Sequence, residues 1–138
     1  MTPSPILRFA ALAAAAALMR ACAATASNPQ STGRLVIIGG SLGDNEAIYD
    51  RMIQHAGPAP RIGVLPTASG VPEESGPYYV EAFDERIGAP VTELIDIPYD
   101  EPQNAEDPAI AAAMAGKSMI FFTGGDQSRI TAAFLPAD

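Results

Sequence analysis

Residues 119–129 read MIFFTGGDQSR and pass from an apolar run, through two glycines, into a segment with helical character. The continuous apolar run 119–122 is typical of a strand that is buried on both faces, as in a parallel sheet. Gly124 and Gly125 let the backbone adopt a positive φ and come close to a ligand. The stretch therefore predicts a strand, a tight turn and a final helix at about residues 128–134.

The same alternation recurs upstream of this stretch. Three further apolar runs predict buried strands: residues 35–38, 61–65 and 91–97. The segments between these runs have helical periodicity, with a suitable residue at each start and a glycine at each end. The expected starts are Asp44 or Asn45, Pro77 in a first turn, and Asp107 before Pro108, and the expected ends are Gly57, Gly88 and Gly116. Four strands that alternate with four helices predict an α/β fold with a parallel sheet.

Three loops are expected at one edge of this sheet. Right-handed crossovers bring the carboxyl ends of parallel strands to the same edge, where open α/β folds bind ligands. The loops 39–45, 67–69 and 123–127 should therefore share a rim. In the last loop, the N–H groups that lead into the helix can face an oxyanion, a carboxylate or a phosphate. Gln127 adds an amide suited to a peptide group, although an ordinary turn with Asp126 as helix cap also fits.

Composition and charge exclude several classes of function. The chain has 8 Lys and Arg and 16 Asp and Glu, which gives a net charge of −8. This charge argues against a nucleic acid as partner, because contacts with phosphates need a basic surface. One cysteine and one histidine exclude an internal disulfide, a cysteine metal cluster and HExxH zinc chemistry. We therefore expect no metal and no cofactor. His55 falls at the end of the first helix, where its charged form would suit the helix dipole, away from the candidate site.

The N-terminal residues have the composition of an export signal. Arg8 precedes an apolar stretch at 9–19 that is too short to span a bilayer, and small residues suited to signal cleavage follow. An alternative is a lipid anchor at Cys22, because residues 19–22 resemble a bacterial lipobox. We expect a secreted or periplasmic protein, organised into three parts: a signal peptide at 1–26, a linker at 27–33 and an α/β domain at 34–138.

Four stretches agree in order and spacing with a known family. They are FFTGGDQSR at 121–129, IGVLPTAS at 62–69, Gly39-Gly40, and Tyr79 with Phe83 ahead of Gly88. With these motifs the chain resembles the dipeptidase E–cyanophycinase family of serine peptidases over roughly residues 35–134. The resemblance implies a three-layer α/β sandwich around a parallel sheet, like that of the class I glutamine amidotransferases, and incomplete in this chain.

The resemblance also implies an activity. Gly124 or Gly125 would supply an N–H of the oxyanion hole, and Gln127, Asp126 and Thr123 would form the substrate site. The implied substrate is cyanophycin, a polyaspartate that carries arginine on each side-chain carboxyl, and the products are β-Asp-Arg dipeptides. Two alternatives stay open, namely a related aspartyl dipeptidase or amidotransferase-like hydrolase, and a non-catalytic exported α/β binding protein. A homodimer also stays open.

The family places its nucleophilic serine on a strand–helix elbow with the sequence Gly-Thr-Ser-Ala-Gly, and a histidine follows further on. Neither occurs at the corresponding place in the 138 residues. The elbow would come one strand after the helix at 128–134. We therefore interpret the chain as the N-terminal part of such an enzyme, a fragment or truncated gene product that is inactive by itself. The loop 39–45 departs from the Gly-Gly-Ala-Glu-Asp-Lys version of intracellular members, which leaves the substrate subgroup open.

Overall fold

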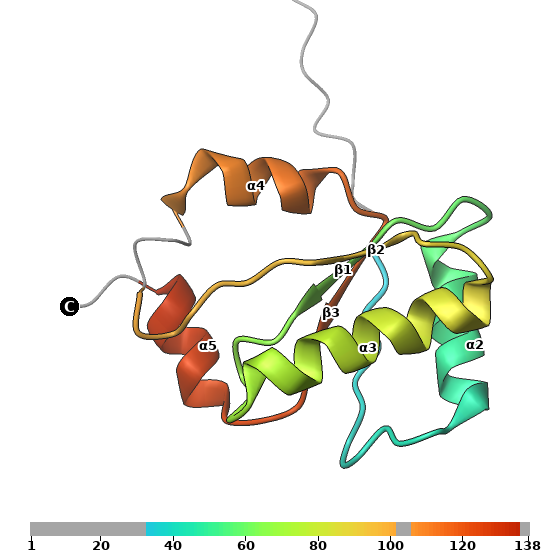
Figure 1. Cartoon of the computed structure of the whole chain (residues 1–138), viewed down its shortest axis with the longest axis horizontal. Helices are drawn as coiled ribbons and strands as arrows, with labels where there is room; N and C mark the ends of the chain where they lie inside the picture. The colour runs from blue at the N-terminus through green and yellow to red at the C-terminus, as the bar shows by residue number, and fades with distance from the viewer. Residues whose placement is uncertain (1–32, 102–105, 136–138) are drawn as a thin grey trace, which may run out of the picture. The chain divides into compact units, whose positions relative to one another are not determined.

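The computed structural model describes residues 33–101 and 106–135. The chain divides into two units, residues 1–33 and residues 34–138, and the second contains the α/β fold (Figure 1). The expected signal peptide at 1–26, with Cys22, lies outside the described residues, as does most of the expected linker. Within the described ranges, no helix has the length and apolar character needed to cross a membrane.

The described part of the chain contains a parallel sheet of three strands, as the alternating pattern predicted. The strands are β1 (Ile62–Leu65), β2 (Thr92–Leu94) and β3 (Met119–Phe122), in the spatial order β2-β1-β3. The helices are α2 (Glu46–Ala56), α3 (Pro72–Ile87), α4 (Pro108–Ala115) and α5 (Gln127–Phe134). β1 is therefore the central strand, and the loops that follow β1 and β3 emerge side by side.

Helices cover both faces of the sheet (Figure 1). On one face, α2 and α3 pack on β1 and β3 through a cluster of buried apolar side chains: Leu42, Tyr49, Met52, Ile62, Val64, Ala82, Phe83 and Phe121. On the other face, α4 and α5 contribute to a second cluster, which includes Leu65, Ile95, Ile97, Ile110, Ile120 and Ala133. The sheet and its two helix layers form the expected three-layer α/β sandwich.

The strand β1 shows why a continuous apolar run is needed at the centre of this sheet. All four of its residues are buried. Ile62 and Val64 point into the first cluster and Leu65 into the second, because successive side chains alternate between the faces of a strand. At Gly63, a Cβ atom would lie 2.8 Å from the Ile95 side chain, so this position leaves room for the second cluster.

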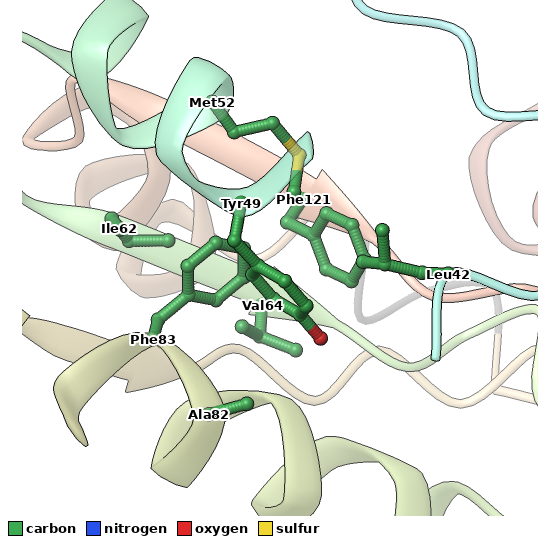
Figure 2. Packing of buried hydrophobic residues seen from close by; sticks show 8 residues of the cluster. All are labelled: Leu42, Tyr49, Met52, Ile62, Val64, Ala82, Phe83 and Phe121. Atoms are coloured by element: carbon green, nitrogen blue, oxygen red, sulfur yellow. The ribbon is translucent and has the colours of Figure 1, made fainter. Parts of the chain in front are cut away.

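Aromatic packing joins α2, α3 and β3 on the first face (Figure 2). The rings of Tyr49 and Phe83 meet edge to face with centroids 5.2 Å apart, and those of Phe83 and Phe121 with centroids 5.3 Å apart. The Arg86 guanidinium carbon lies 3.9 Å from the centre of the Tyr49 ring. Burial raises the pKa of the Tyr49 hydroxyl to about 12, so this residue stays uncharged in the core.

The predicted helix caps are confirmed at three places. Asn45, Asp107 and Asp126 each precede a helix and accept a hydrogen bond from a backbone N–H of its first turn. The distances to Ile48 N, Ala109 N and Ser128 N are 3.3, 2.7 and 2.8 Å, respectively. At the other ends, the predicted Gly57, Gly88 and Gly116 all follow the last helical residue. Local capping chemistry therefore sets most helix boundaries.

The predicted strand at 35–38 is wrong. These residues have no strand structure, and the side chains of Leu35 and Ile37 are both 84% exposed. A continuous apolar run forms a buried strand only when a neighbouring strand and covering helices are available. Among residues 33–101 and 106–135, no backbone hydrogen bond joins the run to the sheet. Only Ile38 packs against the first cluster, from its margin.

Two boundaries also differ from the prediction. α3 begins at Pro72 rather than near Pro77, which lies inside the helix. Proline favours the first turn of a helix, and Pro72 occupies that position instead, followed by Glu73 and Glu74, whose charges suit the positive helix end. β2 is shorter than the predicted run 91–97, although the Ile95 N–H still donates to the Val64 carbonyl at 2.9 Å.

Replacing Phe83 by Ala should lower the free energy of unfolding by about 3–5 kcal/mol, because the ring is fully buried between Tyr49 and Phe121. Tyr78→Ala is the matched control, since this aromatic residue lies on the same helix and is 48% exposed. We expect the control to lose about 1 kcal/mol or less. Urea unfolding followed by circular dichroism measures both values. Equal losses in the two variants would contradict the assigned core.

Candidate functional site

Two loops meet at the carboxyl ends of β1 and β3. The Thr123 N–H donates to the Leu65 carbonyl at 3.1 Å and extends the pairing of the strands by one residue. Beyond it, the Asp126 N–H donates to the Ala68 carbonyl at 2.9 Å. These bonds hold the loop 67–69 against the turn that leads into α5. The shared rim expected for these two loops is therefore present in the structure.

The contact between the loops is closest at Gly125. Its φ is +147°, and a Cβ atom at this position would lie 1.9 Å from the Ala68 carbonyl oxygen. No side chain fits in that space, so the turn requires glycine here. Gly124 differs, because a Cβ there would have no atom within 4 Å. The two glycines of the motif therefore differ. Gly125 allows the two loops to pack closely, whereas the space around Gly124 is unoccupied by the described residues.

The turn leaves two backbone donors without an acceptor. Thr123 and Asp126 use their N–H groups for the bonds to the end of β1 and to the loop that follows it. In the part of the chain that the structure describes, the N–H groups of Gly124 and Gly125 have no protein acceptor, and both residues are exposed. They immediately precede α5, whose N-terminal end carries a partial positive charge. Consecutive free amides of this kind can stabilise an oxygen atom that carries or gains negative charge.

Asp126 and Gln127 follow the two free amides. The Asp126 carboxylate caps α5, and hydrogen bonds from Ser128 hold the pKa of this carboxyl below its usual value, with a smaller contribution from the charge of Arg129. Asp126 is therefore negatively charged at neutral pH. Gln127 is the first residue of α5 and is exposed beside the turn. The capping role left open by the sequence is thus present together with an accessible turn.

Thr123 lies beneath the turn rather than on its surface. It is 4% exposed, and its hydroxyl is buried without a hydrogen-bond partner in the described residues, as is that of Thr67 in the neighbouring loop. Ser69 is also buried, and its hydroxyl accepts a hydrogen bond from the Val71 N–H at 3.1 Å. The substrate contact predicted for Thr123 stays a prediction. In this structure the Thr123 side chain is buried.

The third loop expected on the rim, residues 39–45, is exposed except at Leu42, and its place on the rim stays a prediction. Leu42 is buried in the cluster beneath α2 and α3, as Figure 2 shows, and its carbonyl accepts a hydrogen bond from the Asn45 N–H at 3.3 Å. Among the described residues, no hydrogen bond joins the loop 39–45 to either of the other two loops. The candidate site therefore consists of the loop after β1 and the turn after β3.

Sequence reasoning gave no role to three residues that shape this site. They are Ala68, Arg129 and Tyr99. The Ala68 carbonyl accepts a hydrogen bond from the Asp126 N–H and another from the Arg129 side chain, the latter at 3.2 Å. The centre of the Tyr99 ring lies 5.3 Å from the Arg129 guanidinium carbon. The signal for Arg129 was its position within the motif, two residues after Gln127. The contacts themselves join residues far apart in the chain, which no local pattern indicates.

His55 lies in the last turn of α2, as predicted, but its charged form is not favoured. The Arg34 side chain donates to His55 Nδ1 at 2.8 Å. Desolvation, together with the positive charges of Arg34 and Arg51, holds the pKa of the imidazole below its ordinary value. The expected preference for the charged form of His55 is therefore not met in the structure. In the described residues, no group of three or more acidic, His or Cys side chains could hold a metal ion.

Two curated proteins to which this chain is similar are cyanophycinases. The chain is 32% identical over 106 residues to the cyanophycinase of Trichormus variabilis and, equally, to the cyanophycinase of a Nostoc species. Each alignment covers 74% of this chain and 35% of the relative, so the chain spans about a third of the length of these proteins. No family model and no solved structure matches. The sequence relationship to cyanophycinases, expected from the motifs, is confirmed.

Gly125→Ala should destabilise the fold by about 2–4 kcal/mol, because the added Cβ meets the Ala68 carbonyl and the backbone is in a region that favours glycine. Gly124→Ala is the matched control and should change the free energy of unfolding by no more than about 0.5 kcal/mol, since nothing lies near the added methyl. Thermal and urea unfolding measure both. A tolerated Gly125→Ala would show that the two loops do not approach as described.

His55 should make stability depend on pH. Because its pKa is lowered in the folded chain, the unfolded chain takes up the proton first as the pH falls through about 6.5. The stabilisation linked to the lowered pKa, which comes first from desolvation and then from the charges of Arg34 and Arg51, is thus present above that pH and is lost as the pH falls through the folded value. We expect the midpoint of thermal unfolding to fall between pH 7.5 and 5.5, and to fall less in His55→Gln. Identical pH profiles for both proteins would contradict this.

Proposed function

We infer that this chain, as a relative of the cyanophycinases, forms the oxyanion and substrate-contact part of a serine peptidase that cleaves cyanophycin. The nucleophilic serine of that enzyme would lie outside the 138 residues. The single observation that carries the proposal is the pair of N–H groups at Gly124 and Gly125, which have no protein acceptor in the part of the chain that the structure describes, in a turn that packs against the Ala68 carbonyl. The similarity to curated cyanophycinases over the same part of the chain supports it.

The proposed chemistry uses these amides in the transition state. When a serine hydroxyl attacks the substrate carbonyl carbon, the carbonyl oxygen gains a negative charge. Gly124 and Gly125 would donate hydrogen bonds to that oxygen, and the start of α5 would add its partial positive charge. Removing one such donor typically costs about 10²–10³-fold in rate. The amides are already free in this structure, so they need no reorganisation when the charge develops.

The local charge supports a neutral or cationic substrate over a free anion. The Asp126 carboxylate is negative at neutral pH and lies beside the two amides, where it would repel a phosphate or a carboxylate. A peptide carbonyl is neutral in the ground state and gains charge only during the reaction. The overall charge of −8 would not repel a polymer that carries arginine, although a charge of this size does not select a substrate. Gln127, exposed beside the turn, would contact the amide groups of such a substrate.

We also propose that the protein is exported through residues 1–26, with lipidation at Cys22 as the alternative route to the cell surface. An exported cyanophycinase would release β-Asp-Arg dipeptides from polymer outside the cell. The second candidate function is a non-catalytic binding protein, in which the N–H groups of Gly124 and Gly125, free of protein acceptors in the described residues, bind an anion or a peptide group without any reaction. A related aspartyl dipeptidase is separated from both by its substrate.

The test measures hydrolysis and binding separately. The product of the complete reading frame should release β-Asp-Arg from cyanophycin, and the 138-residue chain should be retained on bead-coupled cyanophycin but not on bead-coupled polyaspartate, which lacks the arginines. Gln127→Ala should weaken retention about 10-fold, because an exposed amide contact is lost. Gln54→Ala is the matched control, since Gln54 is exposed on α2 and bonds only to Arg51 in the described residues.

Each outcome selects one function. Retention without hydrolysis by the complete product would support the binding protein. Hydrolysis of short aspartyl dipeptides without release from cyanophycin would support the aspartyl dipeptidase. Equal retention on cyanophycin and polyaspartate, together with no hydrolysis, would contradict the proposed substrate.

A further inference from the structure

Arg129 connects the loops that follow all three strands of the sheet. It lies in the first turn of α5, after β3. Its Nη1 donates to the Ala68 carbonyl, in the loop after β1, at 3.2 Å. Its guanidinium carbon lies 5.3 Å from the centre of the Tyr99 ring, in the segment after β2. It also lies along the Gly70 backbone, where a Cβ atom would be 3.4 Å from Arg129 Nη1.

The Ala68 carbonyl is the point through which Arg129 can act on the turn. This oxygen accepts two hydrogen bonds, one from the Asp126 N–H at 2.9 Å and one from Arg129. A carbonyl has two lone pairs, so both are occupied and its direction is defined. The bond from the guanidinium is charge-assisted, which makes it the stronger kind. The same oxygen is the atom against which Gly125 packs.

The direction of the Ala68 carbonyl in turn sets the backbone of the glycines. Gly125 adopts its φ of +147° directly against this oxygen, and Asp126 is bonded to it. In the described residues the N–H groups of Gly124 and Gly125 have no protein acceptor, and both glycines are exposed. Without Arg129, the Ala68 carbonyl would accept a hydrogen bond from the Asp126 N–H alone. One lone pair of its oxygen would then be free, and the peptide group could rotate.

We propose that Arg129 is a positioning residue for the turn at residues 123–126, whose N–H groups at Gly124 and Gly125 form the proposed oxyanion hole. It holds the Ala68 carbonyl in place and thereby orients the N–H groups of Gly124 and Gly125 toward the substrate carbonyl. Tyr99 covers the guanidinium and restricts it to this arrangement. Arg129 does this without contacting the substrate. The inference rests on the proposed function for its effect on catalysis, while its effect on the orientation of the turn is independent of any substrate.

The first experiment reads the turn directly. In ¹⁵N-labelled protein, Arg129→Gln should shift the amide resonances of Gly124 and Gly125, while that of Gly63, in the core of β1, stays unchanged. Arg129→Lys, which keeps one charged donor, should return both resonances toward their wild-type positions. Arg51→Gln is the matched control, because Arg51 is exposed on α2 and its side chain bonds only to Gln54 in the described residues.

The second experiment reads catalysis in the product of the complete reading frame. Arg129→Gln should lower kcat on cyanophycin about 10- to 100-fold with little change in KM, because misdirected amides act mainly on the transition state. Arg129→Lys should recover part of kcat. A lowered unfolding midpoint with unchanged kcat per folded molecule would assign Arg129 a structural role only, and would overturn the proposal.

The two experiments separate this inference from the proposed function. If the wild-type product neither binds nor cleaves cyanophycin but the Gly124 and Gly125 resonances still respond to Arg129→Gln, the proposed function fails and the positioning role stands. If those resonances do not move, the positioning role fails whatever the activity. Should Arg129→Gln not fold, Tyr99→Ala should give smaller shifts of the same two resonances, and their absence would equally overturn the role.

Discussion

The candidate site depends on the contact between the Ala68 carbonyl and the backbone at Gly125. A Cβ atom on Gly125 would lie only 1.9 Å from the carbonyl oxygen, so the loop after β1 and the turn after β3 can join only because this residue is glycine. The contact uses the Asp126 N–H, whereas the N–H groups of Gly124 and Gly125 have no acceptor among residues 33–101 and 106–135. The parallel sheet makes the contact available, because it ends β1 and β3 side by side.

Local chemistry made most of the fold predictable. Asp107 and Asp126 cap the helices that their positions indicated, and Gly88 ends α3 with a positive φ of 75°. These features act within a few residues of the chain, where a sequence pattern carries the information. The strand expected at 35–38 failed for the opposite reason. Its formation depends on a neighbouring strand and on cover for Leu35 and Ile37, which are largely exposed.

The position of the site was predictable from the sequence, but the contacts that hold its loops in place were not. The motif indicated that Gly124 and Gly125 would lie on the rim with the loop 67–69, and the hydrogen bond from Asp126 to Ala68 joins the two segments there. The bond from Arg129 to Ala68 spans 61 positions in the chain, and the contact with Tyr99 depends on the path of the segment after β2. Such contacts follow from the three-dimensional arrangement of the loops rather than from spacing in the sequence.

The proposed function depends on the two amides of the turn binding a carbonyl oxygen of the substrate. Titrating the ¹⁵N-labelled chain with a short soluble cyanophycin oligomer, whose internal backbone carbonyls are neutral, and following the backbone amide resonances, tests this most directly. We expect saturable shifts that are largest at Gly124 and Gly125, extend to Gln127 and are absent at Gly63. Saturable shifts centred on another part of the chain, or no shifts at any oligomer concentration, would contradict the proposed contact.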